Sequence, residues 1–179
     1  MIAKGNLPGF DEPLDMLQAC HGRIEEQLDT LEKLAEHLPA RGADAMAQSA
    51  AKAVLRYFDT SGAYHHQDED EDLFPLLRRR AGALGRTEVA AAIDELEREH
   101  ATMDAQWRRL RETLSSIAAL REAQVDAGAV ARFAWLYRRH MERETMLVLP
   151  FANEVLGQEE RTELGTRMAA RRGGSRTTG

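Results

Sequence analysis

Two copies of one short pattern hold the residues of this sequence that could do chemistry. Each copy reads histidine, three residues, glutamate, five residues, proline, as His65, Glu69 and Pro75 and again as His140, Glu144 and Pro150. Residues four apart lie on one face of a helix, so each histidine and its glutamate can point at the same place. Such pairs are either metal ligands or members of a solvated polar face. Because the pattern recurs, we favour a metal site.

Two more histidines lie in the middle of apolar helical stripes, His21 near Leu17 and His100 near Leu96. One histidine in such a stripe is usually a satisfied core residue, but buried histidines and carboxylates together cost several kcal/mol unless coordinated. Mixed nitrogen and oxygen ligation suits iron, manganese or zinc, and two carboxylates shared by two histidine pairs predict two metals. The predicted ligands are His21, His65, Glu69, His100, His140 and Glu144, with both glutamates bridging.

Other polar residues near these positions are interpreted as supporting or solvent-facing. His66 points about 100° away from its neighbour on a helix, and we expect it to pair with Asp70. Most acids at 68–72 are expected to be solvated. Glu25 and Asp104 each follow a stripe histidine by four residues, and we interpret them as partners of the ligands or as solvent-facing acids. The sequence leaves open whether Glu25, His66 or Asp104 joins the coordination.

Periodic apolar positions predict the four long amphipathic helices that must position these side chains. The stripes cover residues 11–38, 43–80, 87–120 and 130–156. Their short connections predict an all-α, antiparallel up-and-down four-helix bundle. We expect an irregular segment at 1–10, the bundle with a short C-terminal helix at 11–172, and a disordered tail at 173–179.

The first two predicted helices align with the last two, so the bundle consists of two repeated helical hairpins. His21 aligns with His100, and the two histidine-glutamate pairs align with each other. We expect a kink at 59–62 and local unwinding of the turn before Pro75, because proline removes a backbone donor. Pro39 is expected to end the first helix.

Composition restricts the class of protein. The chain has 179 residues, 43% hydrophobic and 30% charged, which favours one helical domain. A net charge of -6 argues against a nucleic-acid partner. No apolar run approaches about 18 residues, and no signal peptide is evident, so we expect no membrane association and a cytoplasmic protein. The single cysteine, Cys20, excludes an intrachain disulfide framework. Monomer and homodimer both remain open.

The chain resembles the hemerythrin-like proteins of the HHE cation-binding family, from about Leu14 to Leu156. The resemblance is carried by His65-His66, Glu69-Asp70 and Leu73-Phe74-Pro75, together with the other predicted ligand positions. It implies a four-helix bundle around two iron ions (Fe²⁺/Fe³⁺, oxo- or hydroxo-bridged) that meet small diatomic or peroxidic ligands. Carried over by position, it assigns the ligand roles to His21, His65, Glu69, His100, His140 and Glu144.

The sequence also departs from two branches that it resembles. Oxygen-carrying hemerythrins have two histidines one turn apart on the third helix and an aspartate on the fourth. Here His100 stands alone between Leu96 and Asp104, and the fourth-helix carboxylate is Glu144. The set of four histidines and two glutamates is similar to that of the iron-cluster repair di-iron proteins, but their cysteine-bearing N-terminal domain has no counterpart in these 179 residues. Both departures count against oxygen carriage and cluster repair.

Our leading hypothesis is a di-iron protein that binds oxygen, nitric oxide or hydrogen peroxide, or reacts with them, in stress protection or sensing. The alternatives are a non-enzymatic module for iron sensing or buffering and a metal-free interaction domain. The repeat is asymmetric three residues before the ligand histidines, where Gly62 aligns with Tyr137. We expect Gly62 to leave room for a diatomic ligand or a channel, and the Tyr137 hydroxyl to donate a hydrogen bond near the bridge.

Overall fold

The computed structural model describes residues 8–122 and 124–173. Every regular element in this part of the chain is a helix, which confirms the all-α prediction. No helix there combines the length and the low polarity that a membrane span requires. The predicted tail is described only at Gly173, and residues 1–7 of the predicted irregular segment also lie outside the described part.

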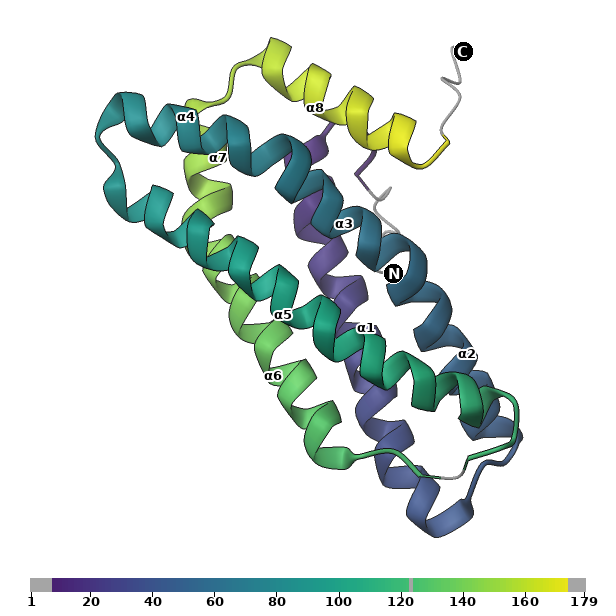
Figure 1. Cartoon of the computed structure of the whole chain (residues 1–179). Coiled ribbons are helices and arrows are strands. Elements are labelled where there is room, and N and C mark those ends of the chain that lie inside the picture. The colour runs from purple at the N-terminus through teal and green to yellow at the C-terminus, as the bar shows by residue number, and fades with distance from the viewer. Residues whose placement is uncertain (1–7, 123, 174–179) are drawn as a thin grey trace, which may run out of the picture.

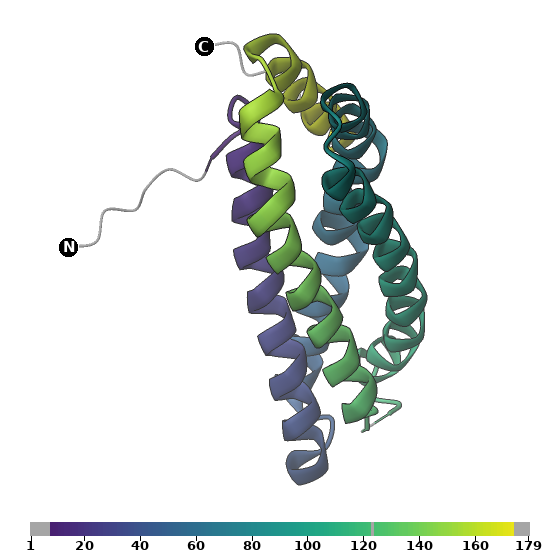
Figure 2. The same ribbon diagram turned by 90° about the vertical axis from the view of Figure 1, so that its left-hand side faces the viewer.

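Four long helical segments pack side by side, as Figures 1 and 2 show. The first is α1 (Pro13–Arg41), and the third is α5 (Thr87–Ala118). The second is a continuous run of α2 (Ala45–Tyr57), η1 (Phe58–Gly62), α3 (Ala63–Gln67), η2 (Asp68–Leu73) and α4 (Phe74–Leu84). The fourth consists of α6 (Ala127–Arg143), η3 (Glu144–Val148) and α7 (Leu149–Val155). A last helix, α8 (Gln158–Arg171), packs on α1 and η2 at one end.

The long segments enclose a common interior. Helix α1 contacts both α2 and α6, and α5 contacts the same two helices from the other side. In Figure 1 the chain reverses its direction along the bundle after each long segment. Successive helices therefore run antiparallel, so residues in the middle of each segment meet at one level.

The apolar core is divided into two clusters along the bundle axis. On α1 the division falls between Leu17 and Ile24, which belong to different clusters, and on α5 it falls between Leu96 and Met103. The predicted ligands occupy the level between the clusters, so apolar side chains close the site from both ends. This arrangement places a polar site in the middle of the protein.

Local sequence explains several helix ends. Asp44 and Asp126 cap α2 and α6 by accepting hydrogen bonds from backbone N–H groups three residues further on, at 2.9 and 3.1 Å. Gly85 ends α4 in the left-handed conformation that glycine adopts without strain. The prediction that Pro39 ends α1 was wrong, because the helix continues through it to Arg41. A proline in the last turn removes only one backbone donor, and the packed face of α1 tolerates that loss.

Three turns of the bundle are widened into π-helix, and two of them come directly before Pro75 and Pro150. A proline ring clashes with the carbonyl four residues back. The residue before each proline donates instead to the carbonyl five residues back, which belongs to Glu69 in one segment and Glu144 in the other. The predicted unwinding before Pro75 is thus confirmed. The third widened turn, 58–62, lies where the sequence predicted a kink.

Candidate metal centre

The six predicted ligands meet midway along the bundle, and all are buried. The most exposed is His21 at 7%, while His65, His140 and Glu144 are each 1% exposed. All four long segments contribute: α1 supplies His21, α3 and η2 supply His65 and Glu69, α5 supplies His100, and α6 and η3 supply His140 and Glu144. The widened turns thus contain the two glutamates.

The six residues form two groups of four. The first group, which we call site A, consists of His21, His65, Glu69 and Glu144. Each of these residues offers one ligand atom, and the four ligand atoms all lie within 4.8 Å of one another. The second, site B, satisfies the same condition with Glu69, His100, His140 and Glu144. Each site therefore has two histidines of its own, and the two sites share both glutamates.

Each glutamate divides its two oxygens between the sites. The four contacts, each from a carboxylate oxygen to a histidine Nε2, are Glu69 Oε1 to His65 at 3.3 Å, Glu69 Oε2 to His100 at 3.4 Å, Glu144 Oε2 to His21 at 3.1 Å and Glu144 Oε1 to His140 at 3.1 Å. This is the arrangement that two bridging carboxylates require, with one oxygen facing each metal position.

The donor atoms fit a cation better than they fit one another. Within the described residues, Nε2 of His21 and His65 and carboxylate oxygens of Glu69 and Glu144 are buried without a hydrogen-bond partner. In site B the two histidine Nε2 atoms face each other at 2.9 Å. Buried polar atoms are normally satisfied, and nitrogen with oxygen donors is the set that iron, manganese and zinc accept. The buried cluster therefore suits metal ions.

Burial and mutual charge set the proton affinities of this cluster. Burial, followed by the charge of Glu144, raises the pKa of Glu69 well above its usual range. Burial also acts to raise the pKa of Glu144, but the positive charge of His140, whose Nε2 lies 3.1 Å from Glu144 Oε1, outweighs it and holds that pKa well below the usual range. Burial acts to lower the pKa of His140, but the negative charge of Glu144 outweighs burial and raises that pKa to about 9. Protons and cations therefore compete for the same donor atoms, so we expect cation binding to release protons.

The outer nitrogens of the ligand histidines have different partners. His100 Nδ1 lies 2.7 Å from Asp70 Oδ1, and His140 Nδ1 lies 3.1 Å from Glu99 Oε2. The predicted pairing of Asp70 with His66 was therefore wrong. Glu99 was missed by the sequence analysis, because it precedes His100 on α5 but contacts a histidine of another helix. Only the packing of α5 on α6 brings that pair together.

His66 belongs to neither site but packs directly against one. Its ring stacks on that of His100 with 4.0 Å between centroids and on that of Tyr137 at 5.6 Å. Its Nδ1 lies 3.7 Å from the carboxylate of Asp104, whose side chain is 65% exposed. Asp104 therefore contacts His66 and not a ligand, and Glu25 pairs with Arg138 at 2.7 Å on the surface.

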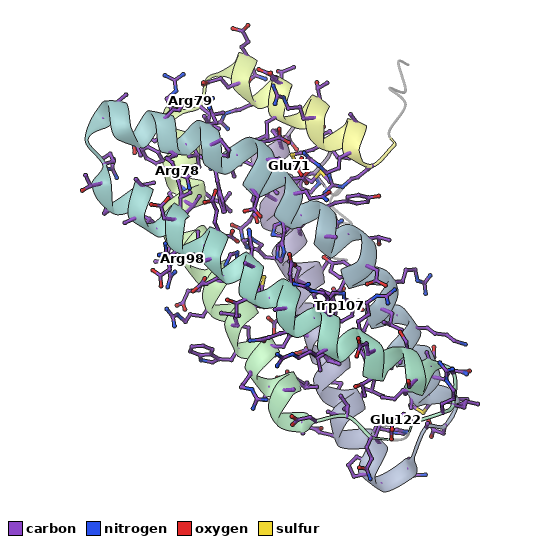
Figure 3. All side chains as sticks on the ribbon, in the orientation of Figure 1. Glu71, Arg78, Arg79, Arg98, Trp107 and Glu122 are labelled. Atoms are coloured by element: carbon purple, nitrogen blue, oxygen red, sulfur yellow. The ribbon has the colours of Figure 1, made fainter. Side chains whose placement is uncertain are left out.

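A cavity of about 190 Å³ lies beside the site. Its walls come from η1, α3, α5 and α6, and the lining residues are Phe58, Asp59, Gly62, Ala63, His66, Asp104, Trp107 and Tyr137. Figure 3 labels Trp107 on α5, whose indole N–H donates to Asp59 at 3.0 Å. A Cβ added to Gly62 would approach Phe58 Cδ1 to 3.2 Å, so the glycine avoids a close contact with Phe58. The predicted position of the Tyr137 hydroxyl near the bridge remains a prediction.

The acids around Glu69 do not behave as one solvated face. Asp68 is fully buried, and its carboxylate accepts hydrogen bonds from Arg171 and from Arg172, the latter at 2.6 Å. Asp72 is also nearly buried and accepts from Arg171 at 2.8 Å. Glu71, labelled in Figure 3, contacts the same arginine at 2.9 Å. The expectation of solvated acids was wrong for Asp68 and Asp72, because α8 covers η2, whereas the side chain of Glu71 is 61% exposed.

Comparison with known sequences agrees with this geometry. The family described as the hemerythrin HHE cation-binding domain matches residues 12–152, a range that includes all six candidate ligands. An uncharacterized protein of Haemophilus influenzae is 30% identical over 163 residues, which cover 91% of this chain and 91% of that protein. The chain belongs to the hemerythrin HHE cation-binding family.

Proposed function

We propose that the protein is a non-haem di-iron protein that binds oxygen, nitric oxide or hydrogen peroxide, or reacts with them, in stress protection or sensing. The observation that carries the proposal is the division of each buried glutamate between two histidine pairs, which prepares two adjacent metal positions. Two histidines and two shared carboxylates leave each ion with open positions for a small ligand. Iron, when bound, supplies the electrons for such chemistry.

The chain's own residues account for positioning and for selection by size. Glutamates on widened turns point into the bundle, and the apolar clusters at both ends of the site limit access of bulk water. The cavity beside His66 and Tyr137 is large enough only for small molecules, and Gly62 is one of its lining residues. We further propose that the Tyr137 hydroxyl donates a hydrogen bond to a ligand bound between the metal positions.

Hydrogen peroxide is the substrate for the first test. Its disproportionation, in which two molecules yield two waters and one oxygen, needs no further reductant. Protein loaded with iron in the absence of oxygen should hold two ions and should consume peroxide. Glu144→Ala should lose both properties, because one bridge and one oxygen for each site disappear. Glu25→Ala is the matched control, since this surface acid follows His21 by one turn but, among the residues that the structure describes, forms its ion pair with Arg138 alone.

The outcomes separate the candidate functions. Two ions without turnover of peroxide, oxygen or nitric oxide would support a non-enzymatic module for iron sensing or buffering. A folded protein that retains no metal would contradict the proposal and support an interaction domain. Tyr137→Phe tests the hydroxyl, because unchanged optical spectra and unchanged peroxide turnover would exclude a hydrogen bond to the bound ligand.

A further inference from the structure

The two sites differ in what lies behind their histidines. In site B both outer nitrogens contact carboxylates, Asp70 at 2.7 Å and Glu99 at 3.1 Å. In site A, His21 Nδ1 contacts only the hydroxyl of Thr145, at 3.3 Å, and the described residues offer His65 Nδ1 no partner. The sites therefore share the same inner ligand types but have unequal support.

Carboxylates behind ligand histidines strengthen a metal site in two ways. They fix the ring with its proton on Nδ1, which leaves Nε2 free to bind, and they raise the basicity of that nitrogen. They also place negative charge near a dication. Glu99 shares its charge with Arg143, at 3.3 Å, whereas Asp70 has no arginine or lysine partner among the described residues. Asp70 is therefore the stronger of the two supports.

Access also differs between the sites. His21 is the most exposed of the six candidate ligands and lines an open surface groove between α1 and the α6–η3 segment. The groove includes Gln18, Thr145 and Met146, and Met146 is 75% exposed. No histidine of site B lines this groove. A cation in site A thus has a short path to solvent past Thr145.

We propose that the two metal positions are unequal, with site B binding the first cation tightly and site A binding the second weakly and exchanging it through the groove at His21. The proposal rests on the metal centre of the proposed function. Asp70 and Glu99 are positioning residues in this proposal, because they act on the cation through His100 and His140. Site A is then the position at which metal content responds to supply.

Metal affinity, not activity, is the readout. Metal-free protein is titrated with Zn²⁺ in the presence of a chromophoric chelator, and native mass spectrometry counts the bound ions. We expect two steps, the first at least about ten-fold tighter than the second, because loss of such carboxylate partners typically changes affinity 10–100-fold. Asp70→Asn combined with Glu99→Gln should weaken binding at site B by about 10–100-fold and leave the affinity of site A unchanged, so the gap between the two steps should close or reverse.

Three further variants locate each step. Thr145→Val should change only the second step, since the hydroxyl supports site A. His65→Ala should retain one tight ion, whereas His100→Ala should retain only a weak one. Circular dichroism confirms that each variant is folded, and Asp70→Asn alone replaces the double variant if the latter does not fold.

The outcomes distinguish this inference from the proposed function. Wild-type protein that binds no Zn²⁺ and no iron would overturn the metal centre itself. Two ions bound with equal affinity, or a first step that Asp70→Asn does not weaken, would overturn only the inequality of the sites. Equal losses in His65→Ala and His100→Ala would overturn it as well, because they would show that neither site holds the first ion alone.

Discussion

Replacing Arg172 by alanine should destabilise the whole bundle, although the residue lies at the end of the last helix. Arg172 donates two hydrogen bonds to Asp68, at 3.1 and 2.6 Å, and Asp68 is fully buried. A hydrogen bond to a charged group contributes about 1.5–3 kcal/mol. Removing one partner of a buried ion pair costs about 3–5 kcal/mol. Because Arg171 still contacts Asp68, we expect the lower end of that range, about 3 kcal/mol.

Urea unfolding of the metal-free protein, followed by circular dichroism, measures the loss directly. A loss of about 3 kcal/mol corresponds to a decrease in Tm of about 6–12 °C for a chain of this size. Arg167→Ala is the matched control, because Arg167 lies on the same helix and contacts Asp72, but its side chain is 56% exposed. An exposed pair contributes about 0.2–1 kcal/mol.

A second substitution isolates the cause. Asp68→Asn in the Arg172→Ala background removes the buried charge that Arg171 alone must then neutralise, so the double variant should lose clearly less stability than the sum of the single variants. Two results would refute the reasoning. One is an Arg172→Ala loss no larger than that of Arg167→Ala, and the other is a strictly additive double variant. Either would show that the Asp68 charge is not what α8 stabilises.

Three further predictions follow from single contacts. Burial lowers the pKa of His66 to about 4, below the usual value of about 6.5. Neutral His66 therefore contributes its full stability above pH 6.5 and loses that contribution as the pH falls to 4. His66→Phe should reduce the difference between the urea midpoints at pH 7 and pH 4.5. Gly165→Ala should displace α8, because a Cβ there would lie 1.8 Å from the Phe10 carbonyl oxygen, and faster proteolysis of the C-terminal helix would report it. Pro75→Ala should let the widened turn return to α-helix and turn Glu69 away from the site, lowering affinity for Zn²⁺; unchanged affinity would show that the proline does not position the glutamate.

Much of the centre was predictable from the sequence because helix geometry is local. Spacings of three and four residues determine which side chains share a face, so the stripes identified the core and placed His21 and His100 in it. The repeated histidine-glutamate-proline pattern identified the other four candidate ligands. Pro75 predicted a disturbed turn because its missing donor and its ring act on the same helix.

Contacts between helices depended on the tertiary structure. The distance and angle at which two helices pack come from the fit of many side chains, which no single periodic pattern encodes. The contact of Glu99 with His140, the contact of Asp70 with His100 and the burial of Asp68 under α8 all arise in this way. The sequence by itself therefore determined the candidate ligands and their pairing along each helix, and only the tertiary structure decided which oxygen faces which histidine and what supports each ring.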